Sequence, residues 1–180
     1  MVHYNIEKER VGNYIQHKGL EHVKDTAAGI LGGHLVTAQT SDKGKQVNRV
    51  LVAQDVYEPG DSEPREFYMS VLLDRSQGRN IIMYSPQGGM DIEAVAEESP
   101  DQIFKETVDP ALGLRDFQAR RIAFNFGLSG KAFKEMVKFV KSLYAAYVGS
   151  DASMFEINPV LKTSDDRVIA VDSKVTLDGN

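Results

Sequence analysis

The 180-residue sequence predicts an α/β protein of the α+β kind, in which helices cover a mostly antiparallel sheet. Two pairs of apolar runs have the form of β-hairpins, one within residues 65–85 and one within residues 154–171. A third observation is the stretch 130–149, where apolar side chains recur at steps of three and four residues, as in an amphipathic helix. Because hairpins join antiparallel neighbours, these elements together favour a sheet with helices packed on it.

The composition is that of a globular protein and argues against several classes of function. Hydrophobic residues make up 42% and charged residues 26% of the chain, which suffices for one domain with a core. The net charge of −5 argues against a nucleic-acid surface. There is no cysteine, which excludes disulfides, thiolate metal sites and a cysteine nucleophile. No apolar run has the length of a membrane span, so we expect a cytoplasmic protein without nucleic-acid or membrane partners.

The first third of the chain predicts a helix and two strands. Residues 21–31 carry apolar side chains on one side and end at a glycine pair, which is typical of a helix and its stop signal. Residues 34–39 predict a strand, and the short apolar run at residues 50–56 predicts a buried one. All four histidines lie in the first 34 residues without the spacing of metal ligands, so we expect surface positions for them.

The remainder of the chain alternates between predicted strands and helices. Strands are expected at residues 65–74, 80–85 and 103–108, and helices at residues 91–98, about 116–126 and 130–149. Gly88 and Gly89 would be able to present bare amides to a phosphate, yet they match no phosphate-loop pattern. A loop that enters the helix at residues 91–98 is the better interpretation of this glycine pair.

Two oxygen-bearing side chains near the C-terminus are the strongest candidates for a functional site. The strand expected at residues 154–157 is followed by Asn158, and the strand expected at residues 168–171 is followed by Asp172. A hairpin-like pair would place both side chains at one end of the sheet, and Mg²⁺ prefers such oxygen ligands. Asn-Pro is also a common turn opener and Asp is common at strand ends, so a turn with a solvated Asp stays open as the alternative.

Several motifs in a fixed order resemble the β subunit of succinyl-CoA synthetase, the ADP-forming succinate–CoA ligase. They are FEINP at residues 155–159, VDSK at residues 171–174, GGMDIEAVAEE at residues 88–98 and GLSG at residues 127–130. The resemblance covers about residues 25–180 and implies the ATP-grasp fold. It implies a C-terminal lobe at residues 51–180 and a remnant of the N-terminal lobe at residues 1–50.

The same resemblance implies an activity and its ligands. The intact enzyme of this family joins succinate and CoA with conversion of ATP to ADP and phosphate, and a phosphohistidine of the α subunit carries the phosphoryl group. By resemblance, Asn158 and Asp172 hold Mg²⁺ on the nucleotide phosphates, and Glu156 is the catalytic residue that faces the visiting histidine. Taken without the resemblance, Glu156 is an ordinary glutamate of a strand.

Further residues are implied as nucleotide contacts. The backbone of the run that contains Ala53 and Gln54 faces the adenine in the resembling family, although Ala53 stands where many relatives have glutamate. Glu66 occupies a motif position whose glutamate contacts the nucleotide. Taken by itself, Glu66 is a glutamate beside an arginine at the start of a strand, which is commonly a solvated edge charge.

One part of the family pattern has no counterpart in the sequence, namely the Gly-rich basic segment that covers the phosphates. Phosphoryl transfer relies on cations and amides aimed at the phosphates, so its absence predicts weak nucleotide binding and no turnover by this chain alone. We therefore expect an excised or naturally truncated portion of a ligase β subunit. The alternative is a non-catalytic folded fragment or partner-binding module. The preference for ATP or GTP, the acid substrate and the oligomeric state stay open.

Overall fold

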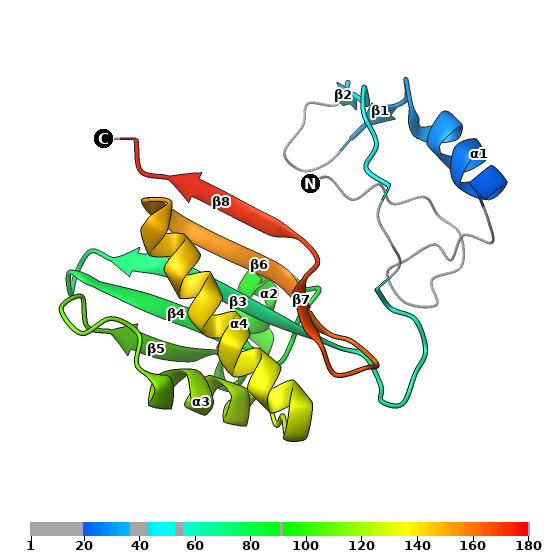
Figure 1. Cartoon of the computed structure of the whole chain (residues 1–180). Coiled ribbons are helices and arrows are strands. Elements are labelled where there is room, and N and C mark those ends of the chain that lie inside the picture. Colours follow the sequence, from blue (N-terminus) through cyan, green and yellow to red (C-terminus); the bar gives the residue numbers. More distant parts are fainter. Residues whose placement is uncertain (1–19, 37–42, 53–55, 91, 180) are drawn as a thin grey trace. The chain divides into compact units, whose positions relative to one another are not determined.

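The computed structural model describes residues 20–36, 43–52, 56–90 and 92–179. Contacts divide the chain into a smaller unit, Val2–Val56, and a larger unit that runs from Tyr57 to Asn180. Figure 1 labels the elements of each unit. Within the described residues, no helix combines the length and the apolar character that crossing a bilayer requires.

The smaller unit contains one helix and a short pair of strands. The helix α1 (Leu20–Ile30) is followed by β1 (His34–Leu35) and β2 (Lys45–Gln46), which pair antiparallel. Gly32 has a φ of +82°, a conformation that suits glycine at the end of a helix, and its N–H donates to the Val47 carbonyl at 2.9 Å. The predicted helix is confirmed. The strand expected at residues 34–39 is short in the described part, and residues 37–39 lie outside it.

The prediction of a buried strand at residues 50–56 is wrong for those of its residues that the structure describes. Leu51 and Val52 are 69% and 64% exposed and belong to no strand. A short apolar run without alternation does not distinguish a buried strand from an apolar connection, and this run lies at the end of the smaller unit. Ala53 and Gln54 lie outside the described residues.

The larger unit is built on an antiparallel sheet of six strands in the order β5-β4-β3-β6-β7, with β8 also paired to β6. The predicted mostly antiparallel sheet is confirmed, since every pair of strands in this sheet is antiparallel. The strands are β3 (Arg65–Asp74), β4 (Arg79–Ser85), β5 (Phe104–Val108), β6 (Ala152–Lys162), β7 (Val168–Ala170) and β8 (Ser173–Leu177).

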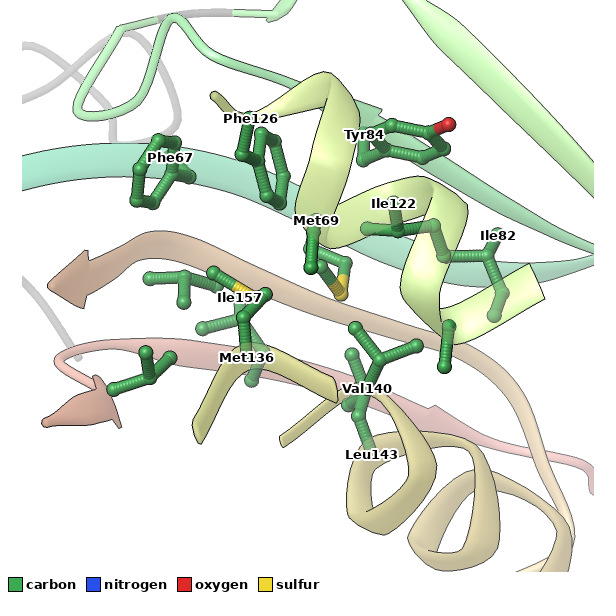
Figure 2. Packing of buried hydrophobic residues seen from close by; sticks show 14 of the residues in the cluster. Phe67, Met69, Ile82, Tyr84, Ile122, Phe126, Met136, Val140, Leu143 and Ile157 are labelled. Atoms are coloured by element: carbon green, nitrogen blue, oxygen red, sulfur yellow. The ribbon is translucent and has the colours of Figure 1, made fainter. Parts of the chain in front are cut away.

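Helices cover the sheet of the larger unit, as Figure 1 shows for α4 (Gly130–Gly149) and α3 (Asp116–Asn125). Alternate residues of β3, among them Phe67 and Met69, meet the apolar stripes of these helices in one core. Figure 2 shows Met136 of α4 and Phe126 at the end of α3 within that core. Burial of each such side chain contributes about 1.5–3 kcal/mol.

The opposite face of the sheet carries the intervening residues of β3. Tyr68 and Ser70 are 2% and 1% exposed, yet neither belongs to the core beneath α3 and α4. The short helix α2 (Ile92–Glu98) and the 3₁₀ helix at Pro100–Gln102 follow the loop after β4. Val95 of α2 is buried outside the main core as well. A second, smaller layer of buried residues therefore lies on the side of the sheet that α3 and α4 leave uncovered.

Strand β6 departs from the hairpin that the sequence predicted near the C-terminus. It does not end at Asn158 but continues through Pro159, and it pairs first with β8 and then with β7. Residues 154–157 are thus not the partners of residues 168–171. Proline lacks the N–H of the ladder and is tolerated in a strand at a bulge. Asn158 and Pro159 form such a bulge, because both lie opposite the single residue Tyr68 of β3.

Candidate functional site

The candidate site lies where β6 changes partner from β8 to β7. Ile157 pairs with Ser173, and the next step of the same register places Asn158 opposite Asp172. The Asn158 N–H donates to the Asp172 carbonyl at 3.3 Å, which brings the two main chains together. Directly opposed residues of an antiparallel pair project their side chains from one face of the sheet. The structure therefore makes neighbours of the two residues that the sequence proposed as a pair.

The carboxamide of Asn158 is held by the loop that leads into α2. Gly89 donates its N–H to Asn158 Oδ1 at 2.8 Å, and Asn158 Nδ2 donates to the Met90 carbonyl at 2.8 Å. These two bonds fix which end of the amide is oxygen. An amide oxygen has two lone pairs, and the Gly89 bond uses one of them. Asn158 Oδ1 thus keeps acceptor capacity for a cation.

Gly88 allows the same loop to lie directly on β3. A Cβ atom at Gly88 would be 2.3 Å from the Phe67 nitrogen and 2.6 Å from the Glu66 carbonyl carbon. These neighbours are backbone atoms and cannot turn aside, so only glycine fits this approach. The two glycines therefore have different roles. Gly88 packs on β3, and Gly89 binds the Asn158 side chain. The interpretation of this segment as a loop entering a helix is confirmed.

Asp172 has the chemistry of the second ligand. Its Oδ1 accepts the Ser173 N–H at 2.8 Å, and a carboxylate offers about four lone-pair sites in all. Within the described ranges, no three or more His, Asp and Glu side chains gather to hold a metal ion by themselves. Mg²⁺ is usually bound through one or two protein oxygens, with waters and substrate phosphates completing its shell. Asn158 and Asp172 fit that requirement.

Glu156 lies two residues before Asn158 in a polar row that crosses the sheet. Its register partners are Ser70 on β3 and Lys174 on β8. The Tyr68 hydroxyl donates to Glu156 Oε2 at 3.2 Å. Burial raises the pKa of Tyr68 to about 12, and the negative charge of Glu156 acts in the same direction. The Tyr68 hydroxyl therefore stays protonated at neutral pH and acts as a hydrogen-bond donor.

Glu66 occupies the start of β3 and is half-buried rather than fully solvated. The Tyr57 hydroxyl donates to Glu66 Oε1, which orients the carboxylate. Ala53 and Gln54, the other expected nucleotide contacts, lie outside the described residues.

Sequence reasoning missed Tyr68, whose hydroxyl contacts the candidate catalytic residue. The signal for it was present in the alternation of residues 65–74. Phe67 and Met69 occupy one face of a strand of period two, so Tyr68 and Ser70 must occupy the other. A buried tyrosine usually has a hydrogen-bond partner, but the strand pairing that makes Glu156 this partner is not encoded in the alternation.

The fold is that of an α+β domain in which Asn158 and Asp172 are neighbours in the sheet, and comparison with known proteins identifies its family. The chain belongs to the ATP-grasp domain family, which matches residues 13–162. Membership in this family implies ATP or ADP as the nucleotide that the domain uses. The predicted fold class is thereby confirmed.

Curated relatives give a narrower comparison. The chain is 67% identical over 163 residues to the β subunit of the ADP-forming succinate–CoA ligase of Christiangramia forsetii, covering 91% of this chain and 41% of the relative. The corresponding subunits of Chlorobium limicola and Bacillus mycoides are 48% and 45% identical over the same share of this chain. The predicted resemblance is confirmed. The chain spans about two fifths of the length of these relatives, 40% to 41%.

Solved structures agree with the fold. ATP citrate lyase of Methanothrix soehngenii, in complex with citrate and coenzyme A, superposes with a TM-score of 0.57 at 16% identity. The match covers 88% of this chain and 33% of that one. ATP citrate lyase of Methanosaeta concilii matches with a TM-score of 0.53 at 14% identity, covering 88% of this chain and 32% of its own. At such identities the likeness concerns the fold alone.

Proposed function

We propose that this chain is the nucleotide- and Mg²⁺-binding portion of the β subunit of an ADP-forming succinate–CoA ligase. The single observation that carries the proposal is the placement of Asn158 opposite Asp172, with the Asn158 amide held by the loop before α2. The identity of 67% to a curated β subunit supports the reaction, in which succinate, CoA and ATP give succinyl-CoA, ADP and phosphate. In this proposal residues 51–180 form the C-terminal lobe and residues 1–50 a remnant of the N-terminal lobe.

Asn158 Oδ1 and the Asp172 carboxylate would hold Mg²⁺. The ion, when bound, offsets negative charge on the nucleotide phosphates. The protein's part is to keep both oxygens in place, and it does so through backbone groups. Gly89 and Met90 restrain the Asn158 amide, and the Ser173 N–H restrains Asp172. Glu66, together with the backbone at Ala53 and Gln54, would contact the nucleotide itself.

Glu156 would meet the histidine of a partner α subunit that carries the phosphoryl group. A carboxylate beside an imidazole favours its protonated form and accepts a hydrogen bond from it. The position of Glu156 supports this role, because it stands two residues from Asn158 on the same strand and so on the same face. Succinate and CoA would be bound by the heteromer, and its location would be the cytoplasm.

The proposal is tested by the turnover of the full-length subunit assembled with its partner subunit. Asp172→Ala should lower ligase kcat by roughly 100-fold or more, because a charge that stabilises the phosphates is lost. The melting temperature should stay that of the wild type. Asp101→Ala removes an exposed aspartate from the 3₁₀ helix and should leave kcat unchanged.

Normal ligase turnover in Asp172→Ala would contradict the metal assignment. Absence of ligase turnover in the assembled wild type would contradict the proposed function and would favour a non-catalytic module.

A further inference from the structure

A row of polar side chains crosses the sheet on the face opposite α3 and α4. Glu156 on β6 stands between Ser70 on β3 and Lys174 on β8. Tyr68 precedes Ser70 by two residues and faces the bulge that Asn158 forms with its proline neighbour. Bulges of this kind redirect side chains and are common beside functional sites. The bulge therefore brings the Tyr68 side chain next to the part of β6 that carries Glu156.

The contact between Tyr68 and Glu156 is specific. The Tyr68 hydroxyl donates to Glu156 Oε2 at 3.2 Å, and within the described ranges no hydrogen bond is made to Oε1. Tyr68 is 2% exposed, so its ring is fixed by packing and its hydroxyl cannot swing away into solvent. A tyrosine has only two side-chain torsions, which makes it a rigid holder of a partner group. One oxygen of the carboxylate is thus fixed while the other stays available.

No second donor on β3 duplicates this contact. Ser70 lies directly across from Glu156 in the register, and opposed residues have Cβ atoms about 5 Å apart. Yet Ser70 Oγ, on a residue that is 1% exposed, makes no hydrogen bond to Glu156. If Ser70 held the carboxylate, Tyr68 would be redundant. Tyr68 is thus the residue of β3 that binds the Glu156 carboxylate.

We propose that Tyr68 is a positioning residue, whose hydroxyl holds Glu156 Oε2 so that Oε1 is presented to the visiting histidine. The inference rests on the proposed function of Glu156. It assigns no proton transfer to Tyr68, which acts only through the orientation of the carboxylate. Loss of the hydroxyl should therefore slow the phosphoryl-transfer step without weakening nucleotide binding.

The test uses the full-length subunit with its partner and a cycle of variants, Tyr68→Phe, Glu156→Gln and the double variant. Tyr68→Phe should lower kcat roughly 10- to 100-fold, the size expected for one hydrogen bond to a charged group, with the KM for nucleotide unchanged. In the Glu156→Gln background the same change should have no further effect. A merely structural role would lower kcat in both backgrounds alike.

Tyr84→Phe is the matched control. Tyr84 is a buried tyrosine on the neighbouring strand β4, but it belongs to the core face and its hydroxyl accepts from Asn125 Nδ2 at 2.9 Å. This variant should keep the wild-type kcat. A 3-fluorotyrosine at position 68 keeps the hydroxyl and should restore kcat, even if Tyr68→Phe itself folds poorly.

The outcomes separate the two levels of the proposal. If Glu156→Gln is inactive while Tyr68→Phe turns over normally, the positioning role is overturned and the proposed function stands. If Tyr68→Phe slows the Glu156→Gln background as strongly as the wild type, Tyr68 does not act through Glu156. If the assembled wild type has no ligase turnover, the proposed function fails and the inference fails with it.

Discussion

Asn158 donates its backbone N–H to the carbonyl of Asp172 at 3.3 Å, so two residues separated by a β-turn and a strand are neighbours in the sheet. The two residues are neighbours even though the strand that contains residues 154–157 pairs with β8, and not with residues 168–171 as the sequence predicted. The register of β6 with β8 and its register with β7 continue one another across this point. The proximity of Asn158 and Asp172 therefore does not depend on which of the two short strands is the partner.

The loop on β3 provides a direct stability prediction. Gly88→Ala would place a Cβ atom 2.3 Å from the Phe67 nitrogen, which forces the loop or the strand to move. We expect a loss of about 1–3 kcal/mol in the free energy of unfolding, as for other overpacked sites. Urea unfolding of the chain measures this loss.

Gly149→Ala is the control for that experiment, because a Cβ atom at Gly149 would meet nothing within 4 Å and the residue ends a helix. It should leave stability unchanged or raise it by up to about 1 kcal/mol. Equal stability of the two variants would show that the loop does not press on β3.

The turn between β6 and β7 predicts a dependence of stability on pH. The Thr163 hydroxyl and the Arg167 guanidinium lower the pKa of the Asp165 carboxyl from 3.8 to about 2. Lys162 and Ser62 lower the pKa of Asp166 from 3.8 as well. A carboxyl whose pKa is lower in the folded state stabilises the fold above its unfolded pKa, and this contribution is lost as the pH falls through the folded value.

Unfolding measured between pH 4 and pH 2 should therefore show a decline in stability, and Asp165→Asn should flatten that decline. A variant with the same slope as the wild type over this window would contradict the assignment to Asp165.

Much of the larger unit was predictable because its elements carry strong periodic signals. The helix α4 has an unbroken apolar stripe from Phe133 to Tyr147, and the pair β3 and β4 is a hairpin of apolar strands. The strand β8 was not predicted, since its residues are all exposed and mostly polar. An edge strand of this kind is defined by its backbone hydrogen bonds to β6. Such bonds cannot be predicted from the alternation of apolar and polar side chains.

The candidate site was predictable in part. Asn158 and Asp172 were expected side by side, and the structure places them so, but the restraint of Asn158 by Gly89 and Met90 was not foreseen. Gly89 precedes Asn158 by 69 positions in the sequence and Met90 precedes it by 68. Contacts over such separations cannot be predicted from a local sequence pattern. The contact of Tyr68 with Glu156 was likewise hidden, because it depends on a bulge that only the pairing of strands defines.

The most direct test of the metal site is the position of an ion in crystals of the full-length protein grown with Mn²⁺ and ADP. Mn²⁺ takes the same oxygen ligands as Mg²⁺ and gives an anomalous X-ray signal that locates it. The account predicts a peak shared by Asn158 Oδ1 and the Asp172 carboxylate, absent from Asp172→Ala and retained in Asp101→Ala. A peak held by other residues, with neither Asn158 nor Asp172 as a ligand, would contradict it.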